Sequence, residues 1–253
     1  MAHDDEGSGP AVVLLHSGVC DRRMWHPQTA VLCRTHRVIA PDLRGFGETP
    51  VPPEPFGHAD DVVALLDHCG VDRAVLVGSS MGGRVALEMA VTHQDRMTAL
   101  VLLCAGHRDL PDSAASEAFE AEEDRLLEAR DVEGAVALNV ETWLGPSADE
   151  DTRALVRDMQ RRAFEVQLAA DQLDPGPELL RVDIDPARVD VPTLVVGGEL
   201  DMDVFRDGAR HLADVIPDAR LTMLPWAGHL PSLERPDDVT PLISAFLAEV
   251  GSR

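Results

Sequence analysis

The sequence of 253 residues lacks lysine and tyrosine altogether. Without lysine there is no Schiff-base chemistry and no P-loop lysine, and without tyrosine no phenol can act as an acid. No apolar run approaches the roughly 20 residues that a membrane-spanning helix needs. The acidic amino terminus, MAHDDEGSGP, also lacks the pattern of a signal peptide. We therefore expect a cytoplasmic protein.

Cysteine is scarce as well. The four cysteines show no CxxC spacing and have no close metal-ligand neighbours: Cys20, Cys33, Cys69 and Cys104. This pattern predicts reduced thiols in apolar surroundings, with no metal site and no cofactor bound through sulfur.

Positive charge is the third deficit, because 22 basic residues stand against 45 acidic ones and give a formal net charge of -23. Such a surface repels polyanions, so the composition disfavours nucleic acid and anionic membranes as partners. It favours a neutral or cationic small molecule as substrate.

The apolar pattern is typical of a parallel sheet wrapped by helices. Short, mostly continuous apolar runs predict strands covered on both faces, and amphipathic stretches between them predict helices. The expected strands are Ala11–Leu15, Val38–Ala40, Ala74–Val77, Leu100–Leu103, Thr193–Val196 and Arg220–Leu224. The expected helices are His58–Cys69, Gly82–His93, Phe205–Ile216 and Asp237–Val250. This length fits one α/β domain with an insertion.

The alternation is interrupted once. Between about residues 105 and 190 no strand candidate occurs, and Ser116–Arg130 and Asp149–Ala170 carry apolar residues at helical spacing. We interpret residues 105–190 as a helical cap inserted before the strand Thr193–Val196. Residues 1–104 and 191–253 then form the α/β core.

The segment Gly78-Ser79-Ser80-Met81-Gly82 is a G-x-S-x-G motif with an apolar strand before it and a helical pattern after it. In this context the central serine occupies a strained turn, and the flanking glycines remove Cβ atoms that would clash. The adjoining helix amino terminus favours developing negative charge. The motif predicts Ser80 as a nucleophile.

A nucleophilic serine needs a base and a group that orients the base. His229 follows the last expected strand and precedes the final helix, which places it at the carboxyl edge of the sheet. The acid is expected after the strand Thr193–Val196, where Asp201 is our choice among the competing carboxylates Glu199, Asp201 and Asp203. Asp109, after the preceding strand, remains an alternative.

The oxyanion hole needs two backbone donors. One is expected from Met81, which follows the nucleophile, and the other from the loop after the first expected strand, His16-Ser17-Gly18-Val19. We interpret His16 as a buried residue that braces this loop.

Taken together, these segments resemble the α/β-hydrolase superfamily. The resemblance is carried by VVLLHSGVCDRRMW, APDLRGFGETP, VLVGSSMGG, VPTLVVGGELD and WAGHLPSLERP, which span nearly the whole chain. It is closest to small hydrolases such as 3-oxoadipate enol-lactonases, haloperoxidase-like esterases and relatives of strigolactone receptors. The resemblance implies an α/β-hydrolase fold with Ser80, Asp201 and His229 as the catalytic triad. It implies Gly18 and Met81 as the oxyanion residues.

Two departures from the family pattern affect these expectations. The sequence has His16-Ser17-Gly18 where the family usually has His-Gly, so the second oxyanion donor is Gly18 or Val19. Only about ten residues precede the strand Ala11–Leu15, so the usual N-terminal hairpin is shortened: its first strand is expected to be absent and its second at most partial. An exposed sheet edge would invite pairing with a second chain, so we expect a monomer or a weak homodimer.

The serine at the elbow separates this chain from relatives with an aspartate nucleophile, the haloalkane dehalogenases and epoxide hydrolases. Acyl transfer to Ser80 is then expected, with a small neutral ester or lactone as substrate and no cofactor. The candidate pocket residues are Val19, Trp25, Trp143, Phe164, Met202, Val204 and Leu230. Arg22, Arg23 or Arg162 could bind a substrate carboxylate, although solvent-facing roles suit them better.

The alternatives are a receptor-like binding protein with vestigial hydrolysis and a non-hydrolytic or carbon–carbon bond-cleaving enzyme on the same fold, such as a cofactor-free oxygenase or a cyclase.

Overall fold

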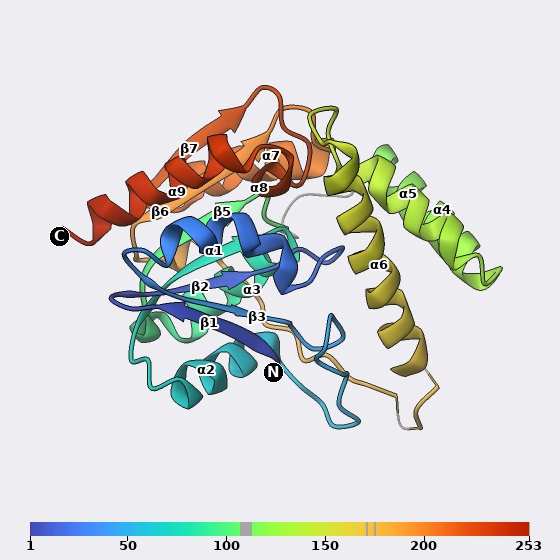
Figure 1. Cartoon of the computed structure of the whole chain (residues 1–253), viewed down its shortest axis with the longest axis horizontal. Helices are drawn as coiled ribbons and strands as arrows, with labels where there is room; N and C mark the ends of the chain where they lie inside the picture. The colour runs from blue at the N-terminus through green and yellow to red at the C-terminus, as the bar shows by residue number, and fades with distance from the viewer. Residues whose placement is uncertain (107–112, 171, 175, 253) are drawn as a thin grey trace.

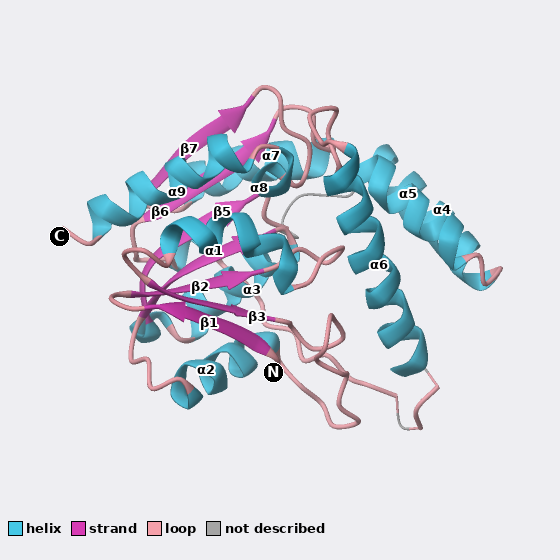
Figure 2. Cartoon of the chain, viewed as in Figure 1, coloured by secondary structure: helices cyan, strands magenta, loops and turns pink. Residues whose placement is uncertain are grey.

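A seven-stranded sheet forms the centre of the molecule (Figures 1 and 2). The computed structural model describes residues 1–106, 113–170, 172–174 and 176–252. The strands are β1 (His3–Gly7), β2 (Ala11–Leu15), β3 (Arg37–Pro41), β4 (Ala74–Ser79), β5 (Met97–Leu103), β6 (Thr193–Gly198) and β7 (Ala219–Leu224). Their spatial order is β1-β3-β2-β4-β5-β6-β7, and every pairing is parallel except that of β1 with β3. The fold is that of an α/β hydrolase, as the sequence predicted.

The N-terminal edge is more complete than the sequence suggested. β1 pairs in antiparallel register with β3 over the whole strand, from His3 opposite Pro41 to Gly7 opposite Arg37. The sequence predicted at most a partial strand here, but β1 pairs along its whole length. It is a single strand where the family usually has a hairpin. β1 carries Asp4, Asp5 and Glu6 at the sheet edge, and charged side chains disfavour pairing of such an edge with another chain.

Helices cover both faces of the sheet. The face formed by Val12 and Leu14 of β2 packs against α1 (His26–Leu32) and α9 (Pro236–Val250). The alternate residues, Val13 and Leu15, face α2 (His58–His68), α3 (Met81–Thr92) and α7 (Asp203–Val215). Because neighbouring strand residues point to opposite faces, the continuous apolar runs supply both cores.

The insertion between β5 and β6 is helical in its described part, as expected for the interrupted stretch. It contains α4 (Ala114–Glu128), α5 (Val132–Trp143) and α6 (Glu150–Ala170). These helices lie together at the end of the sheet where the parallel strands finish (Figure 1). Ser113 caps α4 through the backbone N–H of Ser116, which explains why this helix begins just before the predicted segment.

The structure also contains helical elements for which no range was predicted: α1, α5 and the short segments η1 (Arg22–Trp25), η2 (Gln94–Arg96), η3 (Pro186–Arg188) and α8 (Pro231–Glu234). Within the described parts of the chain, none of the helices combines the length and the apolar character needed to span a bilayer.

Candidate active site

Ser80 lies in the sharp turn between β4 and α3, with backbone angles φ 49° and ψ -111°. A positive φ is costly for a residue with a side chain, and such strain is typical of functional turns. The glycines around it are required by space: a Cβ at Gly78 would overlap the carbonyl of Gly82, and one at Gly82 would overlap the carbonyl of Leu15. The G-x-S-x-G segment therefore folds as predicted.

Three predicted residues meet in one hydrogen-bonded relay. His229 Nε2 lies 2.7 Å from Ser80 Oγ, and His229 Nδ1 lies 2.8 Å from Asp201 Oδ2. Each residue follows the end of a different strand, which brings together positions up to 149 residues apart in the chain. All three side chains are buried, so the relay is shielded from water. An alcohol, an imidazole and a carboxylate in this order can activate the alcohol as a nucleophile.

The competing carboxylates are engaged elsewhere. Glu199 forms a bidentate ion pair with Arg210 at 2.8 Å, and Asp203 accepts a hydrogen bond from the backbone N–H of Val204 at the start of α7. Asp201 uses its second oxygen to accept the N–H of Met202 at 2.7 Å. Asp109 lies outside the described residues.

The loop after β2 lies beside the start of α3. A Cβ built at Gly18 would lie 3.7 Å from Met81 Cβ, so the two predicted oxyanion residues are neighbours. Met81 is the first residue of α3, where backbone N–H groups have no acceptor within the helix. A pair of N–H groups at this place can stabilise negative charge on a bound oxygen.

His16 holds this loop through hydrogen bonds on both sides of its ring. Its Nε2 accepts the N–H of Leu43 at 2.9 Å, which leaves Nδ1 as the donor to the carbonyl of Ser17 at 2.8 Å. Burial lowers the pKa of His16 and keeps the ring neutral, as these two bonds require. The geometry agrees with the bracing role that we inferred from the sequence.

Two aromatic rings flank the imidazole of His229. The centroid of the Phe205 ring lies 4.2 Å from that of His229, and the centroid of Trp143 lies 4.7 Å from it. Phe119 of α4 contacts Trp143 edge-on, with 4.7 Å between centroids. The insertion thus reaches the site through Trp143, one of the predicted pocket residues.

The other predicted pocket residues lie in different surroundings. Val19, Trp25 and Leu230 are buried in the same apolar core, and Met202 packs against it. Phe164 instead packs within the insertion, against Leu126, Ala135 and Val136. Val204 is half-buried near the start of α7.

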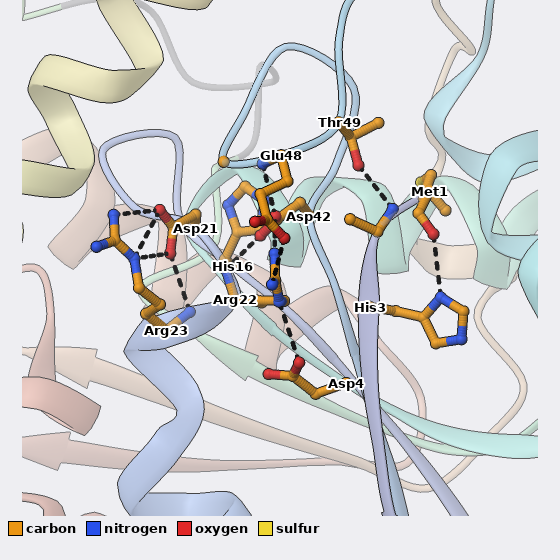
Figure 3. Close-up of polar contacts among 12 residues, drawn as sticks. Met1, His3, Asp4, His16, Asp21, Arg22, Arg23, Asp42, Glu48 and Thr49 are labelled. Atoms are coloured by element: carbon orange, nitrogen blue, oxygen red, sulfur yellow. Dashed lines mark hydrogen bonds and ion pairs between the residues drawn. The ribbon is translucent and has the colours of Figure 1, made fainter.

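The arginines near the site already have partners. Arg22 is bound by Asp4, Asp42 and Glu48, and its contact with the buried Asp42 ties the start of η1 to the end of β3 (Figure 3). Arg23 pairs with Asp21 and with Asp158 of α6, each at 2.7 Å.

A cavity of about 360 Å³ lies between these residues and α6, with Arg22, Arg23, Arg161 and Arg162 balanced by Asp21, Glu48, Asp158 and Glu165 in its wall. Arg162 donates to the carbonyl of Gly47 at 3.1 Å. Since acidic groups match the cations, the cavity offers no free positive charge to a substrate carboxylate.

Cys104 lies directly behind the relay. Its Sγ, a carboxylate oxygen of Asp201 and a ring nitrogen of His229 lie within 4.8 Å of one another. Thiolate, imidazole and carboxylate suit zinc, but burial raises the pKa of the Cys104 thiol well above its ordinary value and disfavours the thiolate. Both ring nitrogens of His229 are also engaged, Nδ1 with Asp201 and Nε2 with Ser80. We therefore assign these atoms to the relay.

Sequence reasoning missed Phe205, Glu234 and Cys104 as neighbours of the relay. Glu234 accepts the backbone N–H groups of Gly228 and Leu230 on either side of His229. The sequence offered one signal for Glu234: it lies five residues after His229. If the chain between them forms a helical turn, the Glu234 side chain points back to the histidine loop. Phe205 and Cys104 carry no comparable local signal.

The comparison with known proteins decides the family. The sequence profile of the family described as alpha/beta hydrolase fold matches residues 10–185, more than half of the chain. The chain belongs to the α/β-hydrolase family.

The relatives in this family include enzymes of different printed activities. A 2-hydroxy-6-oxo-6-(2'-aminophenyl)hexa-2,4-dienoic acid hydrolase of Metapseudomonas resinovorans is 30% identical, over 96% of this chain and 86% of that protein. A protein of Variovorax paradoxus (strain S110) named for carbamate hydrolysis, RutD, is 32% identical over 98% and 96% of the two chains. The solved structure of a thermophilic esterase from Thermogutta terrifontis is 32% identical with a TM-score of 0.77, covering 98% of this chain and 93% of that one. The protein is a hydrolase of this family. Its relatives are named for the cleavage of different kinds of bond.

Proposed function

We propose that this hydrolase cleaves a small neutral ester or lactone through an acyl-enzyme on Ser80. The observation that carries the proposal is the buried relay of Ser80, His229 and Asp201, with bonds of 2.7 and 2.8 Å, at a strained turn. The serine is the only one of these groups that can form an ester with an acyl group.

The mechanism uses each group in turn. His229 takes the proton of Ser80 as the oxygen attacks the carbonyl carbon, and Asp201 stabilises the imidazolium that forms. The backbone N–H groups of Met81 and Gly18 stabilise the oxyanion. His229 then gives its proton to the leaving alcohol, and a water molecule activated by the same imidazole releases the acid. In a lactone, the leaving alcohol and the acid belong to one molecule.

The preference for a neutral substrate rests on charge. Arg22 and Arg23 are paired with carboxylates of the protein, and the formal net charge of -23 repels anions. The esterase of Thermogutta terrifontis, at 32% identity, supports ester cleavage.

A small fluorophosphonate followed by intact-protein mass spectrometry tests the proposal. We expect one adduct on the parent protein and none on Ser80→Ala. Ser79→Ala is the matched control, because the neighbouring Ser79 is buried and its hydroxyl has no hydrogen-bond partner among the described residues. Folded parent protein that forms no adduct, or an adduct that persists in Ser80→Ala, would overturn the assignment of Ser80.

Carbon–carbon bond hydrolysis is the second candidate, because the relative from Metapseudomonas resinovorans is 30% identical and acts on a dienoic acid. Turnover of p-nitrophenyl acetate and of γ-lactones is compared with turnover of a 2-hydroxy-6-oxo-dienoic acid. Faster turnover of the dienoic acid would replace ester cleavage as the assigned reaction. Saturable ligand binding without turnover of any of these compounds would favour a receptor-like protein.

A further inference from the structure

The turn between α5 and α6 is docked on the loop that carries His229. The backbone N–H of His229 donates to the carbonyl of Trp143, the last residue of α5, at 3.1 Å. Ser147 in the turn contacts the carbonyl of Trp226 at 3.5 Å and accepts a hydrogen bond from Arg235 at 2.9 Å. The histidine loop and the base of the insertion therefore share a continuous set of contacts.

Glu234 lies at the centre of these contacts. One oxygen accepts the N–H of Gly228 at 3.0 Å and the other accepts the N–H of Leu230 at 3.3 Å, so the carboxylate spans the backbone of His229. Gly145, in the turn after α5, packs against the same carboxylate: a Cβ built at Gly145 would overlap Oε2 of Glu234. A single side chain thus hydrogen-bonds to the histidine loop and packs against the base of the insertion.

The two backbones approach closely because both contacts are made by glycine. A Cβ at Gly228 would lie 2.5 Å from the nitrogen of Gly145, and a Cβ at Gly145 would overlap the carboxylate of Glu234. Neither glycine has a positive φ, so the requirement here is space and not backbone conformation.

The environment of Glu234 makes its hydrogen bonds necessary. The residue is 6% exposed, and burial raises the pKa of its carboxyl group, an effect that the backbone N–H groups oppose. A buried carboxylate without these donors is strongly disfavoured. Movement of the turn away from the loop would remove Gly145 from its contact with this carboxylate and expose the carboxylate.

We propose that Glu234 is a positioning residue that locks the His229 loop to the α5–α6 turn, so that the imidazole is correctly placed only while the insertion is docked. The relay needs this precision because both ring nitrogens form hydrogen bonds at fixed distances, and a shift of about 1 Å in such a site can reduce turnover about a hundredfold. The consequence for turnover rests on the proposed function of Ser80. The placement of the imidazole does not.

Glu234→Gln tests the lock with little change in shape. One carboxylate oxygen becomes an amide NH₂ that faces a backbone N–H and cannot accept its hydrogen bond. Glu88→Gln is the matched control, because Glu88 is also a buried carboxylate (3% exposed) but pairs with Arg84 on α3, away from the histidine loop. Both variants are compared with the parent by thermal melting, so that a general loss of stability is measured separately.

Two readouts separate the lock from the proposed function. The first is the low-field NMR resonance of the imidazole proton shared by His229 and Asp201, which requires no turnover. The second is the rate of fluorophosphonate labelling. We expect Glu234→Gln to weaken or lose the resonance and to label at least tenfold more slowly, while Glu88→Gln retains both. An unchanged resonance in Glu234→Gln would overturn the lock, whereas a parent without Ser80-dependent labelling would overturn the proposed function alone.

Gly145→Ala approaches the same contact from the insertion. Its Cβ would displace the carboxylate of Glu234, so we expect the same weakening of the resonance. If one lock is responsible, the double variant Glu234→Gln/Gly145→Ala will label no more than about twice as slowly as the slower single variant, because neighbouring changes to one contact are not additive. Multiplicative effects of the two changes would overturn a shared lock.

Discussion

Asp201 accepts a hydrogen bond from Nδ1 of His229 at 2.8 Å, while its other oxygen accepts the N–H of Met202 at 2.7 Å. One oxygen of Asp201 is therefore bound by an imidazole and the other by a backbone N–H. The backbone bond orients the carboxylate, and the carboxylate in turn fixes the imidazole so that Nε2 faces Ser80. This arrangement predicts which substitution will matter most.

Asp201→Asn should reduce kcat by about a thousandfold or more, because an amide can donate to Nδ1 and hold the imidazole in the wrong tautomer. Glu199→Gln and Asp203→Asn are the controls, since their carboxylates bind Arg210 and the backbone of α7. Both should keep kcat within a few fold of the parent, measured with a generic ester. If Asp109→Asn proves the most damaging change, the acid has been misassigned.

Phe205 packs against the imidazole with 4.2 Å between ring centroids. Phe205→Ala should lower kcat by about ten- to a hundredfold with a smaller change in KM, because the ring of His229 loses a wall that limits its movement. Phe205→Leu should recover part of the loss. Phe119→Ala is the control, because Phe119 contacts Trp143 edge-on and is separated from His229 by the Trp143 ring. An equal effect of both alanine variants on kcat would contradict a direct role for Phe205.

The sequence predicted the relay because each of its residues sits in a local pattern: an elbow with required glycines, and loops after two apolar strands. It also placed all six parallel strands. Five are continuous apolar runs that report burial on both faces, whereas β7 at the far edge is largely exposed or half-buried. β1 was underestimated because HDDEG is polar. It pairs with β3 along its backbone, and Arg22 and Arg37 bind Asp4 and Asp5 on it.

The remaining parts of the site depend on tertiary packing. Phe205 and Trp143 come from α7 and α5, and no periodicity in either helix indicates that both rings contact one imidazole. The pocket was the least predictable part, because Phe164 serves the interior of the insertion and Trp25 serves the main core. An apolar residue has the same sequence pattern in either place.

His58 makes the stability of the protein sensitive to acid. Burial lowers the pKa of His58 to about 4 from its ordinary value of 6.5, with Asp61 opposing the shift, and the ring Nδ1 has no hydrogen-bond partner among the described residues. Between pH 6.5 and 4 the unfolded state binds a proton that the folded state does not, so the free energy of unfolding falls as the pH falls. The contribution of this residue to the loss between pH 7.5 and 5 is about 2 kcal/mol.

Urea unfolding of the parent and of His58→Gln at pH 7.5, 6 and 5 measures this contribution. The variant should lose less stability than the parent over the same range, because glutamine does not titrate. Carboxylates contribute equally to both proteins and cancel in the difference. Parallel curves for parent and variant would show that His58 is not buried in its neutral form.

The excess of acidic residues makes stability depend on salt. At a formal net charge of -23 the folded chain repels itself, whereas its exposed ion pairs contribute little each. Raising NaCl from 20 to 500 mM shortens the screening length from about 20 Å to about 4 Å. We expect the melting temperature at pH 7.5 to rise by a few degrees, measured by calorimetry. At pH 5, close to the isoelectric point of about 4.6, the same addition should have a much smaller effect. A melting temperature that falls with salt at pH 7.5 would mean that the paired arginines, and not the net repulsion, dominate the electrostatic energy of the folded state.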